Sequence, residues 1–502
     1  MRTRAAAVLS WCLAVAAPLA GQQPGLSIDV QQFRLPDGLT VILHRDPTTP
    51  TITTNIWYHV GSARETPGRT GFAHLFEHLM FEGSKNVPEG KIDEWFQEVG
   101  GSPNGSTMQD RTNYFQQFSS NALELALFIE SDRMGKLLDA MSEATVNGQR
   151  DVVKNERRQS YDNSPYGLAD QVLTEALYPP SHPYSWPVIG YMDHLSAASY
   201  DDVANFFRRY YVPNNASLVI AGDIDPAQAR RAVEKWFADV PAGQPVPPLT
   251  ATPPQVTQVK KLLLEDRVQL PRLYLTWISP AAYAPGDAAM IVLGRILSGG
   301  KNSRLYKRLV YDQQIADDVT AYQQGLKLNG EFGVVATART GHPLAELDTA
   351  IMQELERIRR EPPEPRELAR VINQYEVSFL EQLERPSAKA DQLNEYLFYT
   401  GTPDYFNQDL ARLRALTPAD ISRAAAAWLK PEARVVLSIV PQGKTELGLA
   451  GSTPVPNQDL QSSPPTRRAG AVAPQRSRPE AARPDWRAPV RETAFSAPRP
   501  RP

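Results

Sequence analysis

The sequence predicts a protein of mixed strands and helices arranged in two similar halves. Short runs rich in β-branched and aromatic residues are interspersed with amphipathic helical patterns as far as residue 441. A strand-like run and a following helix near residue 54 recur near residue 273, which indicates an internal duplication. The length of 502 residues also exceeds that of one typical core, so two or more domains are expected.

The composition is that of an ordinary soluble globular protein. Apolar residues make up 42% of the chain and charged residues 22%, and the formal net charge is -3. This charge argues against general nucleic-acid binding, and no basic motif offsets it. We therefore expect no nucleic-acid partner.

The N-terminus is typical of an export signal. Two arginines precede a short apolar run at residues 5–17, and small residues follow, so residues 1–21 are predicted to be a cleaved signal peptide. The apolar run is shorter than the ~20 residues that a membrane-spanning helix needs. The single cysteine, Cys12, lies inside this segment, so the mature chain would have no thiol or disulfide. These features predict an exported bacterial protein, periplasmic or secreted, with no membrane span in the mature chain.

The first half is expected to span residues 28–240 and to begin with strands. Residues 33–44 form two strand-like runs around a Pro-Asp-Gly turn, and residues 51–60 form a third. A helix that carries two histidines follows. The later elements are helices at 91–99, 123–138, 149–161, 198–211 and 226–237, and strands through 112–118 and at 217–221.

The most informative motif is a pair of histidines with a glutamate between them. His74, Glu77 and His78 stand in the order H-x-x-E-H. In a helix, His74 and His78 project from one face, one turn apart, and two imidazoles at that spacing can bind one zinc ion. Glu77 can then reach the open coordination position, as in the inverted zinc-peptidase motif. Only 7 histidines occur in 502 residues, so the pairing favours a metal site over half-exposed packing.

A third metal ligand is expected from an inward-facing carboxylate. Glu156 lies three and four residues beyond Val153 and Val152, which we place on the buried side of their helix. An isolated inward glutamate is costly to bury unless it is paired or binds a metal, so Glu156 is a candidate. The pattern leaves three other glutamates open: Glu124, Glu130 and Glu143.

The rest of the chain is divided by its composition. A proline-dense linker at residues 241–256 precedes a second half, expected at residues 257–445. Pro, Arg, Ala and Ser dominate the tail at residues 446–502. Such a segment buries too little apolar surface to offset the entropy of ordering, so we expect it to be disordered.

The second half repeats the first without its metal motif. Residues 273–279 echo residues 54–60, and the helix through residues 291–297 echoes the motif helix. The residues at the motif positions of the repeat are Ile291, Gly294 and Arg295, in place of His74, Glu77 and His78. Only the first half is therefore expected to be catalytic.

Taken together, these motifs resemble the pitrilysin/insulinase family of zinc metallopeptidases, in particular the zinc-bearing subunit of bacterial two-chain members and of mitochondrial processing peptidase. The resemblance covers about residues 30–440. It rests on His74-x-x-Glu77-His78, Tyr58-x-x-Gly61-Ser62, Val152-Val-Lys-Asn-Glu156-Arg157, Pro213-Asn-Asn-Ala216 with Gly222-Asp223, and Ser303-Arg-Leu-Tyr306. It implies that Glu156 is the third zinc ligand, because the family's third ligand is a glutamate at a similar distance past the motif.

The resemblance also implies the fold and the substrate strand. The fold would be α+β, with two homologous halves, each a mostly antiparallel sheet with helices packed on it, forming one wall of a clam-shell peptidase chamber. The segment Asn104, Gly105, Ser106 and Thr107 resembles the edge strand along which family members lay extended substrate. Gly105 stands where the family usually has alanine.

The implied activity is that of a zinc-dependent endopeptidase with one Zn²⁺ per chain. Three protein ligands leave a position for water, whose pKa zinc lowers towards ~7, and Glu77 would act as general base. The substrate would be a peptide or an unfolded segment, because strand addition needs an extended and unpaired backbone.

One family feature is absent from this sequence. Family members carry an Arg and a Tyr seven residues apart in a C-terminal domain, whereas Val310 and Asp317 stand at those positions here. We therefore expect a related chain without the zinc motif to supply them, in a heterodimer. The alternatives are a non-catalytic scaffold and a peptide-binding member of the same family. The complete set of three ligands and Glu77 argues against the scaffold.

Overall fold

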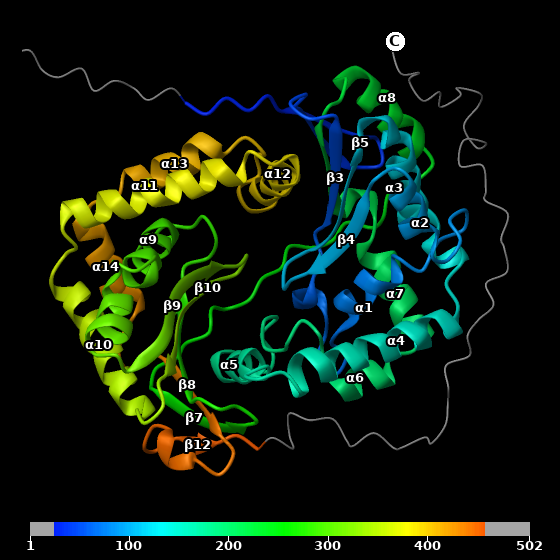
Figure 1. The fold of residues 1–502 in the computed structure, drawn as a ribbon. Helices are drawn as coiled ribbons and strands as arrows, with labels where there is room; N and C mark the ends of the chain where they lie inside the picture. Colours follow the sequence, from blue (N-terminus) through cyan, green and yellow to red (C-terminus); the bar gives the residue numbers. More distant parts are fainter. Residues whose placement is uncertain (1–24, 457–502) are drawn as a thin grey trace, which may run out of the picture.

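The computed structural model describes residues 25–456. The expected signal peptide at residues 1–21, Cys12, and residues 457–502 of the expected tail lie outside the described residues. The described chain forms two halves, each a six-stranded sheet packed with helices (Figure 1). This arrangement confirms the α+β class expected from the sequence. None of the helices within residues 25–456 is both long and apolar enough to cross a membrane.

The first sheet has β4 at one edge. Its strands are β1 (Gln31–Arg34), β2 (Thr40–Arg45), β3 (Thr51–Tyr58), β4 (Ser102–Thr107), β5 (Thr112–Ser119) and β6 (Ala216–Gly222). Their order across the sheet is β1-β2-β6-β3-β5-β4. All neighbouring pairs are antiparallel except β2 and β6, which are parallel. Among the described strands β4 pairs only with β5, so its other side presents backbone groups that an added strand can bind.

The second sheet repeats this order. Its strands are β7 (Lys260–Asp266), β8 (Arg272–Ser279), β9 (Ala316–Gly325), β10 (Gly330–Ala338), β11 (Val435–Pro441) and β12 (Thr453–Pro454). The order β12-β7-β11-β8-β10-β9 puts β7, β11, β8, β10 and β9 where the first sheet has β2, β6, β3, β5 and β4. Five strands of the two sheets therefore share one topology, as a duplicated sequence requires, whereas the outermost strand differs: β1 is antiparallel to β2, and β12 is parallel to β7.

The expected tail boundary at residue 446 is too early. Residues 453–454 form β12, which pairs in parallel with β7, and the Val455 N–H donates to the Leu263 carbonyl at 2.8 Å. Leu449 is buried in the core of the second half. This stretch is held through its backbone and a few apolar side chains, Leu447, Leu449 and Val455, which its proline-rich composition did not indicate.

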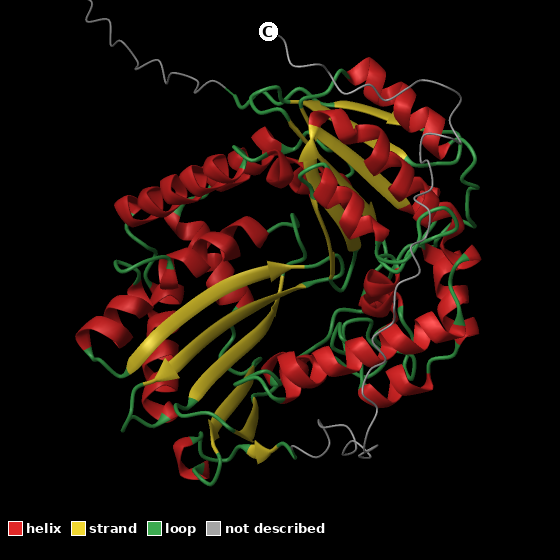
Figure 2. Cartoon of the chain, turned by 45° about the vertical axis from the view of Figure 1, so that its right-hand side comes forward, coloured by secondary structure: helices red, strands yellow, loops and turns green. Residues whose placement is uncertain are grey.

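The helices lie mainly on the outer sides of the two sheets (Figure 2). In the first half they are α1 (Phe72–Leu79), α2 (Lys91–Glu98), α3 (Leu123–Lys136), α4 (Glu143–Arg157), α5 (Ala169–Leu177), α6 (Met192–Ala197), α7 (Tyr200–Tyr210) and α8 (Pro226–Phe237). In the second half they are α9 (Asp287–Ser298), α10 (Leu344–Arg360), α11 (Pro365–Gln382), α12 (Pro386–Thr400), α13 (Phe406–Arg414) and α14 (Pro418–Trp428).

Each half also supplies a helix to the sheet of the other half. Helix α5 packs on β8 and β11, where Val172 joins an apolar cluster with Leu437. Helix α12 packs on β3 and β6, where Leu393 joins a cluster with Val219. Figure 1 shows α5 and α12 between the two sheets. Because both clusters contain residues of both halves, separating the halves would expose apolar surface to water.

The linker at residues 241–256 contains no helix or strand and is bound to the first half. The Asn214 side chain accepts from the Gly243 N–H at 2.8 Å and donates to the Gly243 carbonyl at 3.0 Å. Arg64 donates to the Pro247 carbonyl at 2.8 Å. The linker is thus an extended connection held in place by side chains, as a proline-rich segment permits.

Candidate active site

Helix α1 presents both motif histidines beside each other. Its apolar residues, including Leu75, Phe76 and Leu79, are buried in the core of the first half and fix the helix on the sheet. His74 and His78 lie one turn apart with their ring centroids 4.8 Å from each other. Their side chains are only 12% and 23% exposed, so both imidazoles are largely shielded from solvent.

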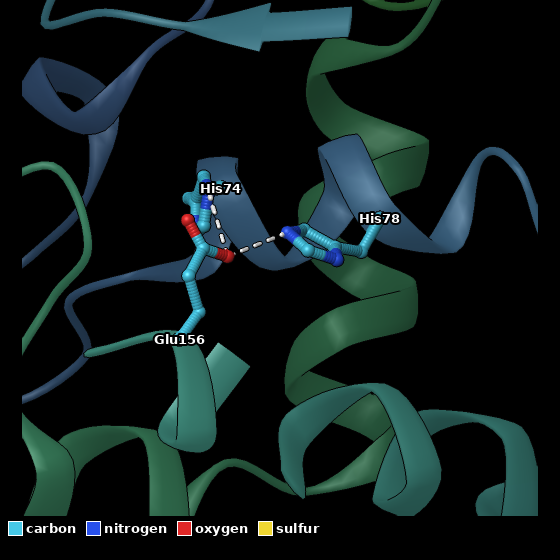
Figure 3. Close-up of side chains that lie close together, drawn as sticks. All are labelled: His74, His78 and Glu156. Atoms are coloured by element: carbon cyan, nitrogen blue, oxygen red, sulfur yellow. Dashed lines mark ion pairs between the residues drawn. The ribbon is translucent and has the colours of Figure 1, made fainter. Parts of the chain in front are cut away.

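Helix α4 brings Glu156 to the two imidazoles (Figure 3). Its Oε2 atom lies 3.2 Å from Nε2 of His78 and 3.8 Å from Nε2 of His74. The potential ligand atoms of the three residues all lie within 4.8 Å of one another. Across residues 25–456 this is the one such group of three His, Cys, Asp or Glu side chains. Two imidazole nitrogens and a carboxylate oxygen are a donor set that suits zinc with an open position.

The surroundings of Glu156 differ in part from the sequence expectation. The helix expected at residues 149–161 is α4, which begins at Glu143 and continues after Arg157 into a π-helical turn. Val153 is fully buried, but Val152 is 46% exposed. Only Val153 therefore marks the buried face of α4, which it shares with Val146 and Arg157.

The three other candidate glutamates are engaged elsewhere. Glu130 is fully buried and accepts from Arg133 and Gln116 in the core beneath the sheet. Glu124 accepts from Lys235 at 2.8 Å. Glu143 lies in the first turn of α4, at the opposite end of the helix from Glu156. Glu156 alone of the four lies beside the histidines.

The electrostatics of the cluster favour metal binding at neutral pH. Burial, and then the neighbouring His78, lower the pKa of His74 to about 4, so its imidazole is neutral above that pH. The hydrogen bond with His78 lowers the pKa of Glu156, which keeps its carboxylate ionised. A neutral imidazole and an ionised carboxylate are the forms that ligate a metal ion.

Glu77 extends from α1 towards the edge strand. Its Oε2 accepts a hydrogen bond from Oγ1 of Thr107 at 2.6 Å. Burial raises the pKa of Glu77, and the Thr107 hydrogen bond opposes that rise. A carboxyl with a raised pKa, beside a metal site and in contact with the edge strand, is suited to general acid–base work.

Two of the four edge-strand residues expected to bind substrate, Gly105 and Thr107, face Glu77. A Cβ atom on Gly105 would lie 3.0 Å from Cγ of Glu77, so glycine allows β4 to approach α1 closely. Ser106 donates to the Asn113 side chain at 2.7 Å, and Arg111 donates to the Ser106 carbonyl at 2.9 Å. Asn104 accepts from the Gly105 N–H at 2.8 Å. These contacts hold β4 in an extended conformation along the site.

A cavity of about 390 Å³ lies over the cluster. His74, Glu77 and Glu156 line it together with the β4 residues Gly105 and Thr107. The residues that line the cavity but were not expected from the sequence include Tyr161, Asp170 and Gln324. Gln324 comes from β9, so the second half contributes to the wall of the pocket. No motif distinguishes these three residues in the sequence, because tertiary packing brings them to the cavity.

The second half keeps the close approach of helix and strand but not the chemistry. Gly294, at the repeat position of Glu77, would place a Cβ 3.1 Å from the Ala321 carbonyl on β9. Strand pairing puts Ala321 at the position that Gly105 has in the first sheet. The glycine of this contact therefore lies on the strand in the first half and on the helix in the second half.

Comparisons with known proteins identify the family to which the chain is similar. The family described as "Insulinase (Peptidase family M16)" matches residues 40–181, and "Peptidase M16 inactive domain" matches residues 197–375. The chain is 29% identical over 407 residues to a protein of Helicobacter pylori named zinc protease PqqE. That alignment covers 80% of this chain and 90% of the relative.

Two solved structures show the same fold. A crystal structure of a protease from Helicobacter pylori superposes with a TM-score of 0.78 at 26% identity, covering 82% of this chain and 100% of that one. The periplasmic protease PqqL from Escherichia coli superposes with a TM-score of 0.72 at 19% identity. That match covers 85% of this chain but 49% of PqqL, so the chain corresponds to about half of the longer protein.

Proposed function

Because this chain belongs to the pitrilysin/insulinase family of M16 peptidases, we propose that it is a zinc-dependent endopeptidase. The observation that carries the proposal is the convergence of His74, His78 and Glu156 within 4.8 Å, with Glu77 between them and the edge strand. This arrangement offers three ligands, a base and a strand for substrate in one place.

In this proposal the two imidazoles and the Glu156 carboxylate would hold one zinc ion. Bound zinc supplies Lewis acidity, which makes water acidic near neutral pH and polarises a peptide carbonyl. Glu77 accepts the proton of the attacking water on its carboxylate and then delivers a proton to the leaving amine. Thr107 orients this carboxylate through its hydrogen bond at 2.6 Å. The raised pKa of Glu77 suits both transfers, because the group can hold the proton between them.

Peptides and unfolded segments are the proposed substrates. The side of β4 that lacks a strand partner within the described residues would pair with a substrate backbone. Asn104 and Ser106 alternate along this strand with Gly105 and Thr107, and the latter two face Glu77. A compact domain cannot offer an unpaired extended backbone, so folded proteins would be spared.

A related partner chain and export from the cytoplasm are further parts of the proposal. Val310 and Asp317 stand where the family carries Arg and Tyr, so a second chain would supply these two residues. The match of this chain to about half of PqqL supports a two-part enzyme, and the name of PqqL as a periplasmic protease supports a periplasmic location. The partner would face the cavity over Glu77 and close it.

The test is cleavage of a mixed library of unstructured peptides by zinc-loaded protein beside a Glu77→Gln variant, with metal content measured for both. Cuts made by the wild type and lost in the variant, with zinc retained, support the hydrolase and the base together. If neither protein cuts, a related chain with the Arg and Tyr is added. If this mixture does not cut the peptides either, the proposed peptidase activity is refuted.

The alternative is a non-catalytic member of the same family that binds peptides or acts as a scaffold. The description "inactive domain" favours it, but that match falls on residues 197–375, which lie outside the metal cluster. The match to the insulinase description covers both histidines, Glu77 and Glu156. Turnover separates the two functions, because either protein could bind zinc.

A further inference from the structure

We propose that Glu65 and Arg157 are positioning residues that hold the two metal-binding helices against each other. This inference rests on the proposed zinc site and concerns how its geometry is fixed. The candidate ligands come from two separate helices, His74 and His78 from α1 and Glu156 from α4. Zinc ligands must be placed to within ~0.2 Å, so some contact has to set the spacing of these helices.

Glu65 binds the beginning of α1. The residue is 7% exposed, and its two carboxyl oxygens accept from the N–H groups of Gly71 at 3.0 Å and Ala73 at 2.8 Å. The N-cap residue, Gly71, has no side chain that could cap this helix. A buried carboxyl group at a helix N-terminus satisfies N–H groups that the helix itself leaves without a partner. His74 is the next residue after Ala73, so Glu65 fixes the backbone that carries the first ligand.

Gly71 connects this end of α1 to a loop beneath α4. Its φ of 89° is in the left-handed region, and a Cβ here would lie 2.7 Å from the Ile189 carbonyl. Gly190 lies opposite with φ 76°, and a Cβ on it would lie 2.4 Å from Cα of Gly71. The two glycine backbones are therefore in direct contact, closer than any side chain would permit.

Arg157 binds the other side of the same loop. Its side chain is 1% exposed, and it donates to the Gly190 carbonyl at 2.7 Å and to the Gln171 side chain at 2.7 Å. Arg157 follows Glu156 directly in α4. A continuous series of contacts thus runs from Glu65 through Gly71 and Gly190 to Arg157, and it ends beside a metal ligand on each helix.

The experiment measures zinc affinity, by competition with a chromophoric chelator, in the wild type and in Glu65→Gln, Arg157→Met and the double variant. The matched control is Arg158→Met, which removes the neighbouring arginine that bonds the exposed Asn155 side chain. Thermal unfolding of the metal-free proteins shows whether each variant folds. If Arg157→Met does not fold, Arg157→Lys is measured in its place.

We expect each single variant to bind zinc 10–100-fold more weakly than the wild type, as for other residues that orient metal ligands. The visible spectrum of the Co²⁺-substituted variants should differ from that of the wild type, which a general loss of stability would not produce. The double variant should bind zinc about as weakly as the single variant with the lower zinc affinity. The reason is that both residues act through the same contact between Gly71 and Gly190.

Two results would overturn the inference while leaving the zinc site intact. One is zinc affinity in both single variants within twofold of the wild type and of Arg158→Met. The other is a double variant whose loss equals the product of the two single losses, since that would show two independent effects. Failure of the wild type itself to bind zinc would refute the proposed function, and the inference with it.

Discussion

Replacing Asp46 by Asn is expected to remove about 2 kcal/mol of stability at neutral pH. Asp46 follows β2 in the first half, and its carboxylate accepts from Lys389 of α12 in the second half and from Thr48. The Asp46 and Lys389 side chains are only 8% and 16% exposed. Burial acts to raise the pKa of Asp46, but the hydrogen bonds from Lys389 and Thr48 outweigh it and lower the value from 3.8 to about 2.

The magnitude and its pH range follow from that pKa. A lowering from 3.8 to about 2, at ~1.4 kcal/mol per pKa unit, corresponds to about 2.5 kcal/mol. Screening by solvent reduces this contribution to about 2 kcal/mol. Because the folded pKa lies below the unfolded pKa, the contribution is complete above about pH 4. It is lost as the pH falls from there through about 2, where the folded state also binds the proton.

The assay is urea unfolding of the wild type and Asp46→Asn between pH 6 and pH 2, with the free energy of unfolding compared at each pH. The difference between the two proteins should be about 2 kcal/mol at pH 6 and should shrink below pH 4. Asp139→Asn is the control, since Asp139 and Lys85 form an ion pair at 3.3 Å with both side chains about half exposed. Its effect should stay below about 1 kcal/mol. A difference for Asp46→Asn that stays constant down to pH 2 would refute the assignment.

Three other perturbations test the site and the core. Thr107→Val should raise the pKa of Glu77, because it removes the donor that stabilises the ionised carboxylate, so the acid limb of the kcat/KM profile should move to higher pH. Arg133→Met should cost about 3–5 kcal/mol in thermal or urea unfolding, because it leaves the fully buried Glu130 without its guanidinium partner. Leu393→Ala should cost about 2–5 kcal/mol, because this fully buried side chain joins α12 to the first sheet.

These three predictions have simple controls. The Thr107→Val profile would contradict the assigned role if its acid limb coincided with that of the wild type. Adding Glu130→Gln to Arg133→Met should recover part of the lost stability, because no unpaired charge then stays buried. Leu380→Ala on α11 should change stability by less than about 0.5 kcal/mol, since Leu380 is 43% exposed.

The sequence predicted the elements of the fold better than their packing. Local patterns were sufficient for strands such as β3 and for the helix with His74 and His78, because residue spacing alone decides which side chains share a face. They could not select Glu156 from four glutamates. Glu130 has an equally inward position, and only its partner Arg133 shows that it belongs to the core.

The exchange of α5 and α12 between the halves was also beyond the sequence patterns. Both helices carry apolar residues at helical spacing, which predicts a buried face but not the sheet that buries it. Gln324 reaches the cavity beside the candidate metal ligands for the same reason, since β9 belongs to the half without those ligands. Long-range packing of this kind depends on tertiary contacts that no local period encodes.

The duplicated halves show how one architecture can separate structure from chemistry. In both halves a helix packs so closely on an edge strand that one of the two facing positions must be small. The first half puts glycine on the strand, at Gly105, which leaves room on the helix for Glu77. The second half puts glycine on the helix, at Gly294. No helix side chain therefore faces the strand at Ala321, and none could act on a substrate there. Its contribution is instead to the wall of the cavity, through Gln324, and to the sheet of the first half, through α12. The asymmetry between the two halves therefore begins with which partner in one helix–strand contact is the glycine.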